Sequence, residues 1–299
     1  MVVDAWETAR RVMERLAAQS VAMRIEVVLV VPSAPDLAVP PALVSELGRV
    51  TVVEHSSHPV GVARAAGVRA AAGEIVVIGE THVFPDDDWA ERVLAAHADG
   101  WSAVTPAVVN ANPGSVLSAA ALHLDYGLFG PERPRRRGRT LPRTNASLAR
   151  GVLLAHGAEL GARLGPLGQL PVPEGGVLHE PEARIAHLNV DRPLAWAHER
   201  YLGGRLVGGA RATTFSPPRR ALYALAMPLV AGVIFARANR RLVQPAARTP
   251  TLIATLVLAA VLQAAGEAVG YATGRLDDAE RAMLRYELFK WRYATGGPA

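Results

Sequence analysis

Along the first two hundred positions, continuous apolar runs take turns with amphipathic stretches, a pattern that predicts strands separated by helices. Continuous apolar runs rich in β-branched residues, typical of strands covered on both faces, occupy residues 25–31, 50–55, 74–80 and 101–109. Amphipathic or small-residue helical patterns occupy residues 6–19, 60–73 and 87–98. Strands connected by helices predict an α/β domain with right-handed crossovers and a mostly parallel sheet.

The last hundred residues follow a different pattern. Two long, nearly uncharged runs at 221–236 and 251–272 predict apolar helices, and the second is long enough to cross a bilayer at about 20 residues per crossing. Four arginines lie between them and would face outward if both helices crossed from the cytosol, against the positive-inside rule. We therefore expect a hairpin embedded from the cytosolic side. The alternative, two core helices of a soluble domain, is favoured by Gln263 and Glu267.

Composition excludes several classes of site and partner. The chain of 299 residues contains no cysteine, which excludes disulfides, zinc–thiolate sites and cysteine nucleophiles. The net charge of +5 is carried almost entirely by arginine, which is abundant in proteins of GC-rich genomes. No nucleic-acid-binding motif accompanies this charge, so nucleic acid is not an expected partner. The amino terminus lacks the apolar core of a signal peptide, so we expect the catalytic part to stay in the cytosol.

One predicted strand ends in residues that can carry chemistry. The run "EIVVIGE" (74–80) ends in Glu80, and Thr81 and His82 follow it, just before the turn "PDDDW". Side chains two residues apart in an extended segment point to the same side, so Glu80 and His82 can converge on one ion or one substrate. Ligands of parallel α/β sheets bind at the carboxyl ends of strands, which is where this pair lies. A capped turn is the alternative explanation.

Four stretches, in their order and spacing, resemble family 2 glycosyltransferases, which are inverting enzymes with the nucleotide-sugar-binding GT-A fold. They are "HPVGVARAAGVRAAAGEIVVIGE" (58–80), "ETHVFPDDDWAERVLAAH" (80–97), "RTNASLARGVLLAHGAELG" (143–161) and "PEARIAHLNVDRPLAWAHERYLGGR" (181–205). The resemblance predicts a GT-A, Rossmann-like α/β domain over residues 1–200. A membrane-associated region with a hydrophobic helical hairpin is expected over residues 201–299.

The resemblance implies a site for a divalent metal and a diphosphate. Glu80-Thr81-His82 occupies the position of the family's Asp-x-Asp motif, where a cation neutralises the diphosphate of the sugar nucleotide and stabilises the leaving group. Carboxylate oxygen suits Mg²⁺, and a histidine shifts the preference toward Mn²⁺. His82 would ligate the metal or bind a phosphate, and His187 matches a further histidine with either role. Arg64 would reach the diphosphate, with an ordinary surface arginine as the alternative.

The resemblance also implies a general base. Inversion requires a base that deprotonates the acceptor hydroxyl opposite the leaving diphosphate. Glu174, in "PVPEGGVLHE", is the best match to the acidic residue that the family uses, and Glu180 and Asp191 are competing candidates. A solvated loop carboxylate is the alternative for Glu174.

Acceptor contacts are expected from the stretch that begins at residue 143. Asn145 and Ser147 would line the acceptor pocket, although either could cap a helix instead. The segment 131–143 carries six arginines and is expected to be a solvated loop. It could also attract an anionic acceptor or membrane headgroups.

Three departures from the family pattern favour an alternative function. Only "MVVD" stands where the family has its opening strand, and Val31-Pro32-Ser33 replaces the acidic pair that contacts the nucleotide base. No helix separates the Glu174 segment from Pro181. These departures are typical of a catalytically degenerate relative that binds a partner or a glycan at the membrane.

The leading hypothesis is a membrane-attached glycosyltransferase. It would move a sugar from a nucleotide-sugar donor to a hydroxyl of a lipid-linked or cell-envelope glycan, by a single inverting displacement that depends on Mg²⁺ or Mn²⁺. It would act at the cytoplasmic membrane, with the catalytic domain facing the cytosol. A third hypothesis is a different membrane-bound transferase that acts on a polyprenyl-phosphate acceptor.

Overall fold

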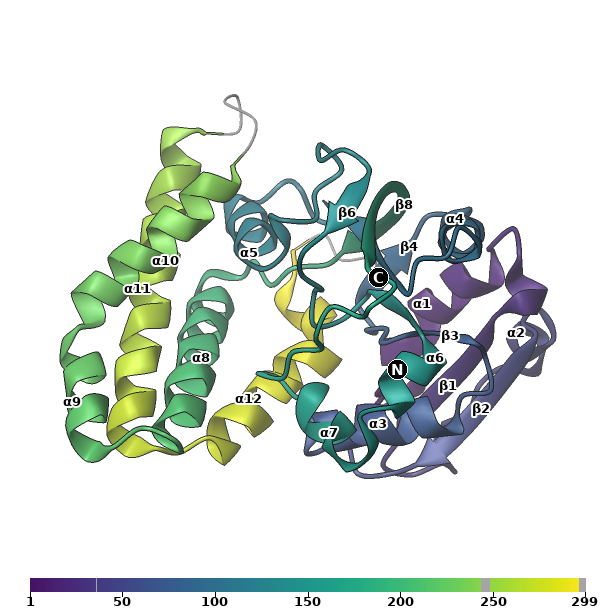
Figure 1. The fold of residues 1–299 in the computed structure, drawn as a ribbon, viewed down its shortest axis with the longest axis horizontal. Helices are drawn as coiled ribbons and strands as arrows, with labels where there is room; N and C mark the ends of the chain where they lie inside the picture. Colours follow the sequence, from purple (N-terminus) through teal and green to yellow (C-terminus); the bar gives the residue numbers. More distant parts are fainter. Residues whose placement is uncertain (36, 243–247, 296–299) are drawn as a thin grey trace. The chain divides into compact units, whose positions relative to one another are not determined.

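The chain divides into two compact units. The computed structural model describes residues 1–35, 37–242 and 248–295 (Figure 1). The first unit, called here the α/β unit, comprises Met1–Val109 and Phe129–His187, and the helical unit comprises Asn110–Leu128 and Leu188–Ala299. The helical unit thus begins before residue 200, where the sequence placed the boundary, and takes in a segment from the middle of the chain.

The α/β unit has the strand and helix alternation that the sequence predicts. Its longer strands are β1 (Glu26–Val31), β2 (Arg49–Glu54), β5 (Ala103–Asn110) and β8 (Val177–His187). Its short strands are β3 (Ile75–Val77), β4 (Val83–Pro85), β6 (Arg136–Gly138) and β7 (Ser147–Ala149). Its helices are α1 (Trp6–Ala17), α2 (Pro41–Ser45), α3 (Val60–Ala70), α4 (Trp89–Ala98), α6 (Arg150–Leu154) and α7 (Leu160–Arg163).

The strand directions correct the prediction of a mostly parallel sheet. β1 and β2 pair in parallel, and Val2 forms an isolated parallel bridge with Val30. The larger sheet has the order β3-β7-β5-β8-β4, with β6 paired to β8. There β7 runs antiparallel to both β3 and β5, and β8 runs antiparallel to β4 and β6. The prediction was wrong here because β6 and β7, at three residues each, are too short to leave a periodic signal in the sequence.

Small residues let α3 pack closely in the α/β unit. A Cβ on Gly61 would lie 2.2 Å from the carbonyl oxygen of Gly161, and one on Gly67 would lie 2.9 Å from Val30 Cγ2. Buried residues of α3, including Ala65 and Val68, join a core cluster with residues of β3 and β7. This packing holds α3 against β1 and α7 and so positions the side chains that α3 carries, including Arg64.

The helical unit is built around two helices in close contact. Its helices are α5 (Val116–Tyr126), α8 (Pro193–Ala212), α9 (Pro217–Leu225), α10 (Met227–Arg241), α11 (Pro250–Thr273) and α12 (Asp277–Leu288). Glycines admit the approach of α8 to α11, because a Cβ on Gly204 would lie 1.9 Å from the carbonyl oxygen of Gln263 and one on Gly208 would lie 2.1 Å from that of Glu267. From the first contact to the second, the residue number increases by four on both α8 and α11. The two helices therefore run in the same direction.

The ends of α11 follow from its sequence. The Thr249 hydroxyl accepts a hydrogen bond from the Leu252 amide at 3.2 Å, and Pro250 begins the first turn. Gly274 ends the helix with φ of 66°, the left-handed conformation that glycine adopts without strain. Within the described residues, α11 is the one helix long and apolar enough to cross a membrane, and α9 with α10 forms a pair bent by 66°.

Glu267 interrupts the apolar sequence of α11 and lies inside the helical unit. Its side chain is buried, and Arg211 Nη1 lies 3.4 Å from its carboxylate. Burial raises the pKa of Glu267, while the neighbouring Arg211 acts in the opposite direction. The helix therefore has one face that packs inside the protein, as the soluble-core alternative predicts, although much of its surface remains exposed.

Candidate active site

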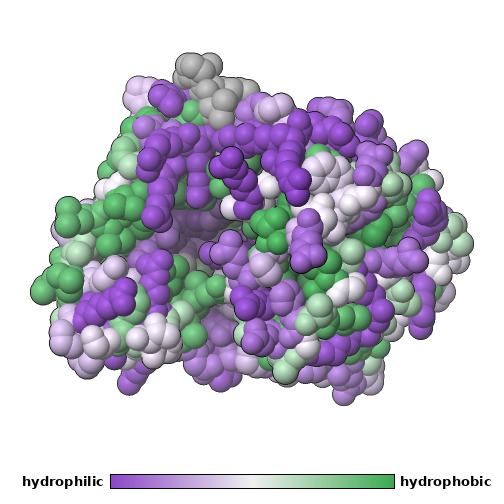
Figure 2. Space-filling model, in the orientation of Figure 1, coloured by the Kyte–Doolittle hydropathy of each residue, from purple (hydrophilic) through white to green (hydrophobic). Residues whose placement is uncertain are grey.

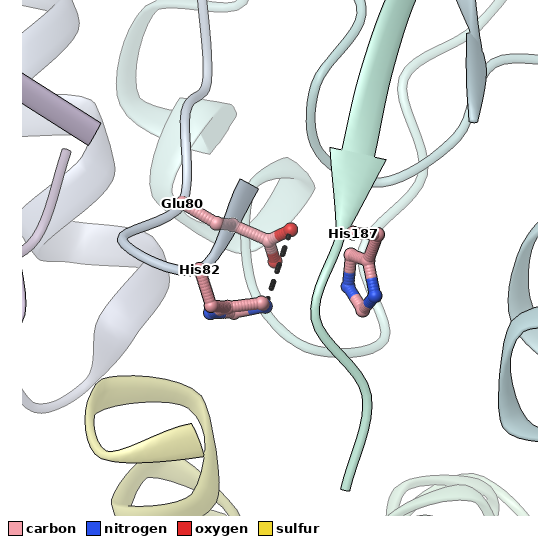
Figure 3. Close-up of side chains that lie close together, drawn as sticks. All are labelled: Glu80, His82 and His187. Atoms are coloured by element: carbon pink, nitrogen blue, oxygen red, sulfur yellow. Dashed lines mark ion pairs between the residues drawn. The ribbon is translucent and has the colours of Figure 1, made fainter. Parts of the chain in front are cut away.

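Glu80, His82 and His187 come together in the α/β unit (Figure 3). One ligand atom from each lies within 4.8 Å of the others. His82 Nε2 is 3.7 Å from Glu80 Oε2, and the two imidazole rings meet edge to face with centroids 4.9 Å apart. In Figure 3 Glu80 and His82 extend from one loop toward the side chain of His187, which leaves the end of β8.

Strand pairing explains why residues more than one hundred positions apart meet. β4 and β8 pair antiparallel with Val83 opposite His187. His82 immediately precedes β4, and His187 is the last residue of β8, so both histidines lie at the same end of this ladder. The loop between β3 and β4 then brings Glu80 to the same place.

This group fits a divalent cation by its donor chemistry. One carboxylate and two imidazoles form a mixed oxygen and nitrogen set, which suits Mn²⁺ or a similar transition metal better than Mg²⁺. Ligand atoms bound to one such ion lie roughly 3 to 4 Å apart, given metal–ligand distances of about 2.1 Å. The observed spread of 4.8 Å requires only a small side-chain adjustment to close around an ion.

Two further side chains contact the Glu80 carboxylate. Arg64, on α3, places Nη2 3.9 Å from Glu80 Oε1 and donates from Nη1 to the carbonyl oxygen of Leu164. Asn145 donates from Nδ2 to Glu80 Oε2 at 2.7 Å. Its backbone has φ of 65°, in the left-handed region where asparagine is one of the few residues other than glycine found regularly.

The contact between Asn145 and Glu80 was not foreseen from the sequence, which suggested an acceptor role for Asn145. The Asn145 amide N–H donates to the carbonyl oxygen of Ile78 at 2.9 Å, which ties this residue to the end of β3. Asparagine in an "N-x-S" stretch is a common helix-capping signal, so sequence alone could not reveal a contact with a carboxylate 65 positions away.

A cavity of about 240 Å³ adjoins this group inside the α/β unit. Arg64, Glu80 and Asn145 contribute polar atoms to its lining, while β1, β3 and α3 contribute mainly apolar side chains such as Val28, Val76 and Val68. Apolar walls with a few converging polar groups are typical of small-molecule sites. The Arg64 guanidinium, the Glu80 carboxylate and the Asn145 amide therefore lie beside a space that can hold part of a ligand.

Ser147, predicted as an acceptor contact, lies elsewhere in the unit and is not brought to the Glu80 group. It is 1% exposed on β7, and its hydroxyl lies 2.9 Å from His97 Nε2. The His97 Nδ1 atom faces the carbonyl oxygen of Trp101 at 2.8 Å, so Nδ1 carries the proton and Nε2 accepts from Ser147. Ser147 therefore joins β7 to α4 and has no surface left for a substrate.

The same histidine makes stability depend on pH. Burial lowers the pKa of His97, and burial likewise lowers that of His179. Below pH about 6.5 the unfolded chain gains protons that the folded chain does not accept, so stability is lost as the pH falls. We expect a lower free energy of unfolding in urea at pH 5.5 than at pH 7.5. His97→Gln should flatten this dependence, and the same change at the partly exposed His156 should leave it unchanged.

Glu174 does not share the site with the Glu80 group. It is exposed in the turn before β8, whereas His187 ends that strand. An extended strand of eleven residues measures roughly 30 Å, which is too far for Glu174 to take a proton from a hydroxyl bound near Glu80. The geometry therefore does not support the base role predicted for Glu174.

The two competing carboxylates are committed to structural contacts. Glu180 is buried and accepts from Arg135 Nε at 2.7 Å. Asp191, in the helical unit, accepts from Asn112 Nδ2 at 3.1 Å and from the Thr295 amide and hydroxyl at 2.6 and 2.7 Å. Both carboxylates therefore have oxygens occupied by neighbouring donors, and neither lies with the Glu80 group.

The arginine-rich segment 131–143 is more ordered than the solvated loop expected from its sequence. It contains β6, which pairs with the start of β8. Arg135 bridges Glu180 and Asp99, and Arg137 lies over the ring of Trp101 at 5.8 Å. The prolines that indicated a loop flank this short strand, and Gly138 is its last residue.

Comparison with known proteins identifies the family. Residues 2–152, which are 151 of the 299 residues, match the family described as glycosyl transferase family 2. The chain belongs to this family. Together with the mixed α/β architecture, this membership confirms the predicted GT-A fold class.

Among solved structures, the chain is similar to those of TarS from S. aureus. TarS 1-349 is 14% identical with a TM-score of 0.41 over 68% of this chain and 63% of that chain. TarS is 13% identical with a TM-score of 0.41 over 69% and 38%, respectively. TarS 1-349 in complex with UDP is 14% identical with a TM-score of 0.41 over 92% and 91%. This chain thus spans less than two thirds of the first two, and no curated protein matches it.

Proposed function

We propose that this chain is a glycosyltransferase that binds a nucleotide-diphosphate sugar at the Glu80 group, with a divalent cation held by Glu80, His82 and His187. The observation that carries the proposal is the convergence of these three ligand atoms within 4.8 Å. Such a cation, when bound, acts as a Lewis acid that neutralises the diphosphate as the glycosidic bond breaks. The donor set favours Mn²⁺ over Mg²⁺.

Arg64 and Asn145 have separate roles in this proposal. The Arg64 guanidinium, 3.9 Å from Glu80, supplies a fixed positive charge for the diphosphate and is only 13% exposed. Its planar donors suit phosphate oxygens. The Asn145 amide holds Glu80 Oε2, which fixes the orientation of the carboxylate and leaves Oε1 directed toward Arg64. Both contacts support a preorganised diphosphate site.

The acceptor and the stereochemistry extend this proposal. We infer transfer to a hydroxyl of a lipid-linked or cell-envelope glycan, by a single inverting displacement at the cytoplasmic membrane with the α/β unit in the cytosol. Family membership supports the chemistry, and the apolar helix α11 supports the location. A polyprenyl-phosphate acceptor is the variant that the arginine-rich segment favours.

A second function, binding of a sugar nucleotide or glycan without turnover, is favoured by one observation. Among the described residues weighed as the base, Glu180 and Asp191 are bonded to other groups, and Glu174 lies at the far end of β8. A transferase needs a proton acceptor for the attacking hydroxyl, whereas a binding module does not.

Calorimetric titration with UDP, GDP and dTDP, each with and without Mn²⁺, tests the proposed donor site. We expect one of the three nucleotides to bind, and to do so only when Mn²⁺ is present. Release of free sugar from the matching sugar nucleotide then separates an active transferase from a binding module. Absence of nucleotide binding in a folded sample would contradict the donor site itself.

A further inference from the structure

An exposed apolar face covers α9 and α10 in the helical unit. Leu222, Leu225, Leu229 and Val233 are exposed at 64, 82, 75 and 48%. Leu222 and Leu225 lie three positions apart on α9, and Leu229 and Val233 lie four apart on α10, so each pair follows one side of its own helix. Figure 2 shows hydrophobic side chains along the left edge of the view, over α9 and α10, with hydrophilic side chains next to them. Soluble surfaces rarely carry so many large apolar side chains together.

The exposed side of α11 also carries large apolar side chains. Val257, Leu258 and Val261 are 43, 51 and 42% exposed, and Val269 follows two turns later at 36%. The one acidic residue of α11, Glu267, is buried and lies outside this stripe. The stripe is therefore apolar along nearly the whole helix.

The charges carried by the segment that forms most of this face are all positive. The sequence 217–266 contains six arginines and no aspartate or glutamate. Arg219 is exposed near the start of α9, and Arg237 and Arg240 are exposed near the end of α10. An apolar face between basic ends is complementary to a bilayer that carries negative headgroups.

Contacts with α8 argue against a crossing by α11. Gly204 of α8 lies opposite Gln263, and the two helices run in the same direction, so Arg200 and Arg205 lie level with the middle of α11. Arg200 pairs with Asp125, and Arg205 pairs with Asp278, whose side chain is 54% exposed. If α11 crossed a membrane, these partly solvent-exposed ion pairs would lie at the bilayer centre, where charged side chains are costly.

We propose that the exposed face of α9, α10 and α11 docks in the plane of a membrane that contains anionic phospholipids, and that α11 lies along the surface without crossing it. The apolar side chains enter the boundary between headgroups and acyl chains, while the arginines contact the headgroups. This inference does not depend on the proposed donor chemistry, because it rests on the helical unit alone.

Co-sedimentation of the full chain with lipid vesicles tests the docking face. We expect at least tenfold tighter binding to vesicles of equal parts phosphatidylglycerol and phosphatidylcholine than to phosphatidylcholine alone, and weaker binding at high salt. Leu225→Glu with Leu229→Glu should abolish binding. Leu194→Glu is the matched control, since Leu194 is 89% exposed but lies on α8.

Fluorescence depth measurements separate docking from crossing. The chain has no cysteine, so single cysteines at Ala254, Val261 and Val269 can carry a probe without background. We expect equal depth at the three positions, quenched by lipids labelled near the headgroup. Greatest depth at Val261 would overturn the in-plane arrangement. Lack of vesicle binding, or a lipid-free dimer that the Leu225 and Leu229 changes dissociate, would overturn the membrane as the occupant and indicate a second copy.

Discussion

Glu80→Gln should weaken nucleotide binding in the presence of Mn²⁺ by at least about 100-fold, and should weaken the binding of Mn²⁺ itself. Loss of a residue that merely orients a metal ligand already costs roughly 10- to 100-fold, and Glu80 would itself be a ligand. The amide keeps the size of the side chain, so the 2.7 Å contact with Asn145 can be replaced without a cavity. Calorimetry, with electron paramagnetic resonance of free Mn²⁺, measures both affinities.

Asp87→Asn is the matched control for this change. It removes one carboxylate seven positions away, but the Asp87 side chain is 73% exposed and contacts only Arg15 among the ion pairs described. The control variant should bind Mn²⁺ and nucleotide as the unmodified chain does. Equal metal-dependent affinity in Glu80→Gln and the unmodified chain would refute the metal site.

Asn145→Gly should give a smaller loss, of about 10- to 100-fold in metal-dependent affinity. Glycine accepts the φ of 65° at this position, so the substitution removes the amide without straining the backbone. Asn145→Ala removes the same amide and adds strain. If the glycine variant binds normally and only the alanine variant is impaired, the role of Asn145 is to allow the left-handed backbone conformation, and it does not position Glu80.

Gly208→Ala is expected to destabilise the helical unit by about 3 kcal/mol, at the upper end of the usual cost of overpacking. The added Cβ would lie 2.1 Å from the carbonyl oxygen of Glu267, a backbone atom that cannot move aside without separating α8 from α11. Urea unfolding followed by far-ultraviolet circular dichroism measures the change.

Gly203→Ala, on the same helix, is the control for this prediction. Its Cβ would meet only the flexible end of Met283, at 3.8 Å. Replacement of a helical glycine by alanine without a clash stabilises a helix by roughly 0.5 to 1 kcal/mol. The two substitutions should therefore have opposite signs. Two small effects of the same sign would mean that α8 and α11 are not in the close contact described.

Much of the candidate site could be predicted because its chemistry is local or belongs to an ordered set of motifs. Glu80 and His82 lie two positions apart at the end of an apolar run, and extended geometry alone places them on one side. His187 could be added only through the resemblance, since no local rule connects it with Glu80. The structure brings the three together through the register of β4 and β8.

The contacts of other residues could not be predicted because their partners are distant in the sequence. Asn145 and Ser147 lie two positions apart, yet one contacts Glu80 and the other contacts His97. The left-handed backbone at Asn145 separates the two directions, and sequence shows no such turn. Glu174 was the best match for a base and Glu180 a competitor, but the sequence could not show the Arg135 contact of Glu180 or the distance that β8 puts between Glu174 and the Glu80 group.

The sequence by itself determined the α/β class, the order of motifs, the position of the Glu80 and His82 pair and the two apolar stretches near the end. Each depends on composition or on a period of two to four residues, which a chain carries without reference to its neighbours. Tertiary structure alone decided the antiparallel directions of β7 and β8 and the partners of Asn145 and Glu180. It also decided that α8, which carries Arg200 and Arg205, packs against α11. These depend on pairing between segments tens to hundreds of residues apart, where register and close packing, and not local pattern, select the contacts.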